Sequence, residues 1–157
     1  MNLNQALLWG FAATIVLTTV LSASRSLGFT RIDIPFMLGT MFTGNRDKAK
    51  WIGFIFHLFN GWIFSLIYIA AFHYTGWNTI WFGALTGLVH VLFVLVAGMG
   101  LLPSIHPRMA SEQTGPTPTR QLEPPGFLAL HYGRQTPIVT ILAHLLFGGI
   151  LGAFYQL

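Results

Sequence analysis

The chain has 157 residues, of which 54% are hydrophobic and 8% are charged, and its formal net charge is +4. A soluble domain carries roughly 25% charged residues, so most of the surface of this protein is expected to contact lipid. It contains no cysteine, which excludes a disulfide framework, iron–sulfur clusters, c-type haem and thiolate-bound metals. None of its four acidic residues lies in a long apolar run, so a carboxylate-bridged di-iron centre or a carboxylate proton relay is not expected.

Four segments are long and apolar enough to cross a bilayer, which takes about 20 predominantly apolar residues. In chain order they are approximately 3–23, 51–72, 78–102 and 136–155. The first lacks a basic N-terminal flank and is too long for a cleavable signal peptide. Only the turn HYTGW separates the second segment from the third, so these two are expected to form an antiparallel hairpin. The sequence predicts an all-α integral membrane four-helix bundle, with residues 1–157 as a single transmembrane domain.

The connection between the first two spans contains an apolar stretch, RIDIPFMLGTMFTG, that is too short to cross a membrane. Asp33 is suited to cap a helix there, and Pro35 is tolerated in a first helical turn. We expect a short helix lying in the membrane interface, with Arg25 and Arg31 beside the lipid headgroups. A re-entrant segment is the alternative interpretation.

Four prolines in the stretch GPTPTRQLEPPG of the third connection, residues 103–135, exclude regular helix and favour a stiff, extended backbone. Two interpretations stay open: an exposed linker, or a folded cap over the end of the bundle. The cap would be anchored by the apolar side chains Phe127, Leu128, Leu130 and Tyr132.

All eight lysine and arginine residues lie in the first and third connections, 24–50 and 103–135. In a four-span protein these two connections share one side of the membrane, and the positive-inside rule places that side in the cytoplasm. The positive charge is therefore explained by topology, and no nucleic-acid partner is expected.

Each span carries small residues at helical spacing, a pattern that lets membrane helices pack closely. Three histidines fall on these stripes: His57, His90 and His144. At about 1.5 Å per residue, they lie roughly 9, 18 and 12 Å from the cytoplasmic end of their spans. We expect the three imidazoles to share one layer and to face one another across the bundle.

Neutral imidazole is the commonest metal ligand and can be one of the two axial ligands of a bis-histidine haem. Three histidines without a carboxylate or thiolate would suit zinc or copper instead. In a third interpretation the histidines bind no ligand and only form hydrogen bonds between helices. For haem, room for the porphyrin is expected at Gly53, Gly61, Gly87 and Gly148. Residues expected near the cytoplasmic rim, where they could pair with propionates, are His106, Arg108, His131 and Arg134.

The sequence contains no HExxH motif, no phosphate-binding glycine loop and no nucleophile elbow, so it does not indicate whether the protein is an enzyme. A transporter or channel is disfavoured because no charged residue lies within a span.

Several segments resemble a family of small four-helix bacterial inner-membrane proteins classed as a domain of unknown function. They are DIPFMLGTMF, HLFNG, HPRM, GPTPTRQLEPPGF, HYGRQTP and AHLLFGGILGAFY, and the resemblance covers almost the whole chain. It implies a four-span protein of the bacterial inner membrane and no established activity. The positive-inside rule, applied to the charged connections, predicts that both termini lie on the opposite, periplasmic side. The resemblance also implies motif positions that favour a site near the cytoplasmic face: Asp33, His57, His106, Arg108, Glu123, Arg134 and His144.

We therefore predict a small membrane subunit of a redox or respiratory complex. Haem b or a transition metal would be held by His57, His90 and His144, under a rim or cap that comprises Asp33, His106, Arg108, Glu123, His131 and Arg134. The alternative is a structural accessory subunit without a cofactor. The expected partners are the lipid bilayer and other membrane subunits or further copies of this chain.

Overall fold

The computed structural model describes residues 1–111 and 114–157, and the regular elements in these two ranges are all helical. Four helical segments are long and apolar enough to cross a membrane: α1 (Leu3–Ser26), α3 (Arg46–Thr75), the continuous segment Ile80–Ile105, and α6 (Thr136–Phe154). The third segment consists of α4 (Ile80–Phe93), the π-helix η1 (Val94–Gly98) and α5 (Met99–Ile105). Two short elements complete the fold: α2 (Ile34–Gly39) and the 3₁₀ segment η2 (Phe127–Tyr132). The predicted all-helical class with four potential spans is confirmed.

Side-chain caps set where the helices begin. Asp33 caps α2 as predicted, because its side chain accepts a hydrogen bond from the Phe36 amide. Asn45 caps α3 by accepting from the amides of Asp47 and Lys48. This cap starts α3 five residues before the predicted span, so the basic residues 46–50, expected in a loop, lie in helix.

Close backbone contacts hold α4 against α6. A Cβ on Gly83 would overlap the carbonyl oxygen of Gly148, and a Cβ on Gly148 would overlap that of Gly83. One turn along, a Cβ on Gly87 would overlap the carbonyl oxygen of His144. Small residues at helical spacing allow this approach, and α4 therefore packs chiefly on α6.

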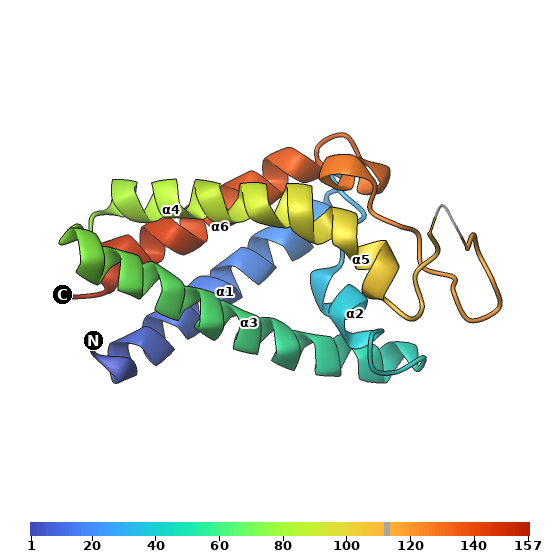
Figure 1. The fold of residues 1–157 in the computed structure, drawn as a ribbon, viewed down its shortest axis with the longest axis horizontal. Coiled ribbons are helices and arrows are strands. Elements are labelled where there is room, and N and C mark those ends of the chain that lie inside the picture. Colours follow the sequence, from blue (N-terminus) through green and yellow to red (C-terminus); the bar gives the residue numbers. More distant parts are fainter. Residues whose placement is uncertain (112–113) are drawn as a thin grey trace.

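The expected hairpin of the second and third spans is correct in connection but not in packing. The left-handed Gly76 ends α3 and starts the short turn to α4. Beyond the turn the two helices diverge, as Figure 1 shows, because α4 is held on α6 while α3 packs on α1 and α2. Aromatic side chains fill the space near the turn, where Phe72 and Phe82 lie 5.9 Å apart between ring centroids.

The two ends of the bundle differ in content. Both termini and the α3–α4 turn lie at one end, and α2 and the long third connection lie at the other (Figure 1). At the first end, the Tyr155 hydroxyl accepts a hydrogen bond from the Asn2 amide at 3.0 Å and lies 3.0 Å from Nε2 of His73. These bonds tie the chain ends to the last turn of α3.

The third connection is folded at its base and exposed at its tip. Met109 and Ala129 are fully buried, and the Tyr132 hydroxyl donates to the carbonyl oxygen of Glu123 at 2.7 Å. The described residues 114–119 are mostly exposed, and residues 112–113, which include Glu112, lie outside the described ranges. The prediction that Phe127 and Leu130 anchor a cap is wrong, since these side chains are 71% and 44% exposed.

We predict that Gly83→Ala destabilises the bundle, because the added methyl group forces α4 away from the backbone of α6. Overpacking of this kind costs about 1–3 kcal/mol, so the midpoint of thermal unfolding in detergent should fall by several degrees. The control is Gly100→Ala, whose Cβ would have no atom within 4 Å and should leave the midpoint unchanged or slightly higher. Equal midpoints for the two variants would contradict the packing role of Gly83.

Candidate functional site

A cavity of about 260 Å³ lies inside the bundle, between α3 and the diverging segment Ile80–Ile105. His57 of α3, His90 of α4 and His144 of α6 all line it. The three histidines, distant in sequence, are thus brought to one hollow. Most of the other walls are apolar, and they include Leu17, Leu21, Phe64, Met99 and Phe147.

His90 is held by three aromatic neighbours. Its ring stacks on Phe64 with centroids 3.8 Å apart, and its Nδ1 lies 3.1 Å from the Tyr68 hydroxyl. The edge of the ring meets His144, with centroids 4.9 Å apart and planes at 83°. Sequence reasoning missed Tyr68 and Phe64. A tyrosine in the middle of an apolar span was the available signal, because a buried phenol needs a hydrogen-bond partner.

His144 is oriented by its own helix. Its Nδ1 donates to the carbonyl oxygen of Thr140 at 2.8 Å, and the side chain is 7% exposed. A carbonyl oxygen only accepts, so Nδ1 carries the hydrogen, and the Nε2 of neutral His144 has an unprotonated lone pair. An imidazole fixed in this way is typical of a ligand-binding histidine.

His57 has a fully buried polar atom that is unsatisfied. Its Nε2 has no hydrogen-bond partner within residues 1–111 and 114–157. The hydrogen bonds between helices that the third interpretation expects are therefore not made at this nitrogen. A buried nitrogen without a partner costs free energy comparable to a lost hydrogen bond, and a ligand that bonded to it would remove this cost.

The trio does not form a ready metal site. Within residues 1–111 and 114–157, no group of three or more histidine, cysteine, aspartate or glutamate side chains is placed to hold a metal ion. The imidazoles line one cavity without converging on one point.

The glycines expected to leave room for a porphyrin instead face neighbouring backbone and side chains, so this prediction is wrong. A Cβ on each would overlap an atom already there: Pro35 O at Gly53, Thr14 Oγ1 at Gly61, His144 O at Gly87 and Gly83 O at Gly148. Their small size serves helix packing.

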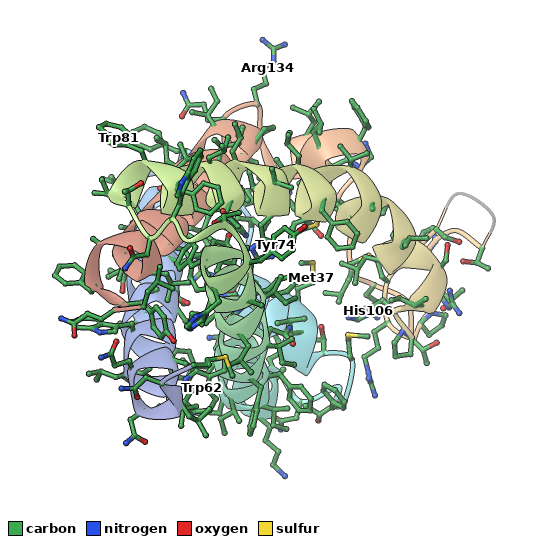
Figure 2. The ribbon with its side chains drawn as sticks, turned by 60° about the vertical axis from the view of Figure 1, so that its left-hand side comes forward. Met37, Trp62, Tyr74, Trp81, His106 and Arg134 are labelled. Carbon is green, nitrogen blue, oxygen red and sulfur yellow. The ribbon has the colours of Figure 1, made fainter. Side chains whose placement is uncertain are left out.

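The predicted rim residues lie outside the cavity, and several of them fasten the loops. His106 is 1% exposed, its Nε2 lies 3.0 Å from the Met37 carbonyl oxygen, and its Nδ1 accepts from the Arg108 amide (Figure 2). Arg108 donates from Nη1 to the Thr40 carbonyl oxygen at 2.7 Å. These bonds join the third connection to α2.

The other rim residues lie at the edge of the same end. Asp33 pairs with Arg25, and Glu123 pairs with Arg31 at 2.9 Å. His131 is exposed, with its Nδ1 2.9 Å from the Pro124 carbonyl oxygen. Figure 2 shows Arg134 pointing away from the molecule. None of the six rim residues lines the cavity. The expected pairing of His106, Arg108, His131 and Arg134 with propionates therefore has no support.

One wall of the cavity is the π-helix η1, which sequence reasoning treated as ordinary helix. Val94 and Gly98 of this segment line the cavity. Single π-turns occur frequently at functional sites. Pro103, in the following helix, lacks the N–H that would bond to the Met99 carbonyl, which lies just after η1.

No protein-family model, curated protein or solved structure matches this chain. The resemblance to small four-helix bacterial membrane proteins therefore stays a prediction. What the fold itself defines is an all-helical protein with four helices that could span a membrane and a histidine-lined cavity between them.

The cap should loosen in acid through His106. Burial lowers the pKa of His106, and Arg108 lowers it further, while the bond to the Met37 carbonyl partly opposes the shift. As the pH falls below about 6.5, the unfolded state takes up a proton that the folded state resists, so stability declines. The thermal midpoint should therefore fall between pH 7.5 and 5.0 by more in the wild type than in His106→Gln. Identical pH slopes would contradict this role.

Proposed function

We propose that the protein is a small membrane redox subunit that binds a lipid-soluble quinol in the histidine cavity. The observation that carries the proposal is the unprotonated Nε2 of neutral His144, a residue that lines a largely apolar cavity. A lone pair there calls for a ligand with an O–H donor or for a metal ion. A quinol has an O–H group that can donate to this nitrogen, and its ring is apolar like most of the cavity wall.

The other two histidines support the same ligand. Nδ1 of His90 is engaged by Tyr68, and the unpartnered Nε2 of His57 can bond to a second ligand oxygen. The cavity volume of about 260 Å³ is slightly below the roughly 300–1,000 Å³ of sites for drug-sized ligands. A single-ring head group suits this size better than a macrocycle does.

A transition-metal ion is the second candidate. It is favoured by the Nδ1 bonds of His90 and His144, because histidines that ligate metals usually have their other ring nitrogen engaged. The three imidazoles would have to move together to bind one ion, since ligand bonds to zinc are only about 2.0–2.1 Å long. Haem b stays a prediction, but the space expected for its porphyrin beside the four glycines is occupied by neighbouring atoms.

The test uses protein purified in mild detergent. We expect no Soret band and no stoichiometric zinc or copper, and we expect a short-chain benzoquinol to quench tryptophan fluorescence saturably. His57→Ala, His90→Ala or His144→Ala should each weaken this binding about tenfold, the loss of one buried hydrogen bond. The losses should be non-additive, because the three residues contact one ligand.

The control is His73→Ala, because His73 bonds to Tyr155 at the opposite end of the bundle and should not affect binding. A Soret band would overturn the quinol in favour of haem, and a metal lost in all three variants would overturn it in favour of an ion. If no cofactor, metal or quinol binds, the protein is a structural accessory subunit. Each alanine would then cost about 0.6–2 kcal/mol of stability separately.

We further propose the orientation of the chain. The end with α2 and the third connection carries the lysines and arginines, so it faces the cytoplasm of a bacterial inner membrane by the positive-inside rule. α2 would lie in the cytoplasmic interface, the proline-rich loop would be cytoplasmic, and both termini would be periplasmic.

A topology experiment tests the orientation. A reporter that is active only in the periplasm should be active when fused after Leu157 and inactive when fused near Gly115. The opposite pattern would place the basic end of the bundle on the periplasmic side.

A further inference from the structure

A second hollow, outside the histidine cavity, runs between α1 and α3. This groove has a volume of about 380 Å³, and its walls include Ser22 of α1 and Phe54 of α3. Its edges are open, because Ser22 and Trp51 are exposed, Trp51 by 72%. The groove reaches His57, which also lines the histidine cavity. In a bilayer, such a groove would be accessible to lipid chains.

The groove continues into a polar hollow of about 470 Å³ at the basic end of the bundle, and the two share Arg25, Asp33 and Lys50. The polar hollow is lined by four cations and two carboxylates, which leave a net charge of +2: Arg25, Arg31, Arg46, Lys50, Asp33 and Glu123. Together the two hollows form one amphipathic channel, which is charged at one end and mainly apolar along the helices.

Two of the cations have no carboxylate to neutralise them. Arg25 and Arg31 are paired, but within residues 1–111 and 114–157 no carboxylate lies within salt-bridge distance of Arg46 or Lys50. The Arg46 guanidinium instead lies 4.9 Å from the centroid of the Phe36 ring.

The surroundings of these two cations favour a further anion, although Asp47 in the first turn of α3 already offsets part of their charge. Arg46 and Lys50 are four residues apart in the first turns of α3, so they are neighbours on one helix face and repel each other. The positive end of the helix dipole adds to the repulsion. An anion bound between them would relieve both effects.

We propose that this channel binds an anionic phospholipid. Its phosphate lies between Arg46 and Lys50 in the polar hollow, and one acyl chain follows the groove towards His57. From Lys50 to His57 the groove follows seven residues of α3, or about 10 Å. Basic pockets between membrane helices are known to bind anionic headgroups. The site does not depend on what the histidine cavity binds.

A soluble phosphate compound has the same anionic group but no acyl chain. It would need only the polar hollow, whereas a phospholipid also needs the groove. The two sources are therefore separated by substitutions in the groove and by competition with inorganic phosphate.

The experiment measures the phosphatidylglycerol retained by the full-length protein, using native mass spectrometry from phosphatidylcholine nanodiscs that contain increasing phosphatidylglycerol. Lys50→Gln should weaken binding about fivefold, which corresponds to about 1 kcal/mol per cation near a membrane surface, and Arg46→Gln should act similarly. The matched control is Lys48→Gln, which removes the same charge two residues away and outside both hollows, and it should change binding less than twofold.

Ser22→Trp tests the groove, because a large side chain there should exclude the acyl chain and reduce retention at least as much as Lys50→Gln. Its control is Thr19→Trp, which alters an exposed position of α1 outside the groove. Equal losses from Lys48→Gln and Lys50→Gln would overturn the proposal in favour of general surface charge. Displacement by millimolar inorganic phosphate, or wild-type retention by Ser22→Trp, would overturn it in favour of a soluble anion.

Discussion

Where Gly83 faces Gly148, and Gly87 faces the carbonyl of His144, α4 and α6 approach so closely that neither has room for a larger side chain. This contact draws α4 away from α3 directly after their short connecting turn. α3 packs instead on α1 and α2, which leaves a wedge of space between the two halves of the hairpin. The cavity in the bundle follows from this division of packing partners.

The wedge is filled differently along its length. Near the turn, aromatic rings such as Phe72 and Phe82 bridge it. Farther from the turn, polar aromatic side chains span it: Tyr68 forms a hydrogen bond with His90, and the His90 ring contacts His144 edge to face. His90 lies three residues after Gly87, so the glycine contact with His144 O also brings the two imidazoles together. The same close packing that stabilises the helix pair thus brings polar groups together between apolar helices.

The basic end of the bundle is organised around α2. This six-residue helix packs on the start of α3, where a Cβ on Gly53 would overlap the Pro35 carbonyl oxygen and one on Gly39 that of Ala49. His106 and Arg108 bond to the carbonyl oxygens of Met37 and Thr40, so the third connection is held on the same helix. The result is a polar end beside a mainly apolar groove.

The sequence by itself determined the helical class, the four potential spans and the separation of charge from the apolar segments, because hydropathy and charge act over one helix at a time. It also identified the cap at Asp33 and the three histidines, whose spacing places them on small-residue faces. It could not decide which glycine meets which neighbour: Gly53, Gly61, Gly87 and Gly148 suggested room for a porphyrin, and each is closed by another segment. Nor could it show that Tyr68 is the neighbour of His90, or that Nε2 of His57 lacks a hydrogen bond. These features depend on the packing of α4 on α6 rather than on α3. That packing is set by backbone contacts between residues more than 50 positions apart, which no local pattern encodes.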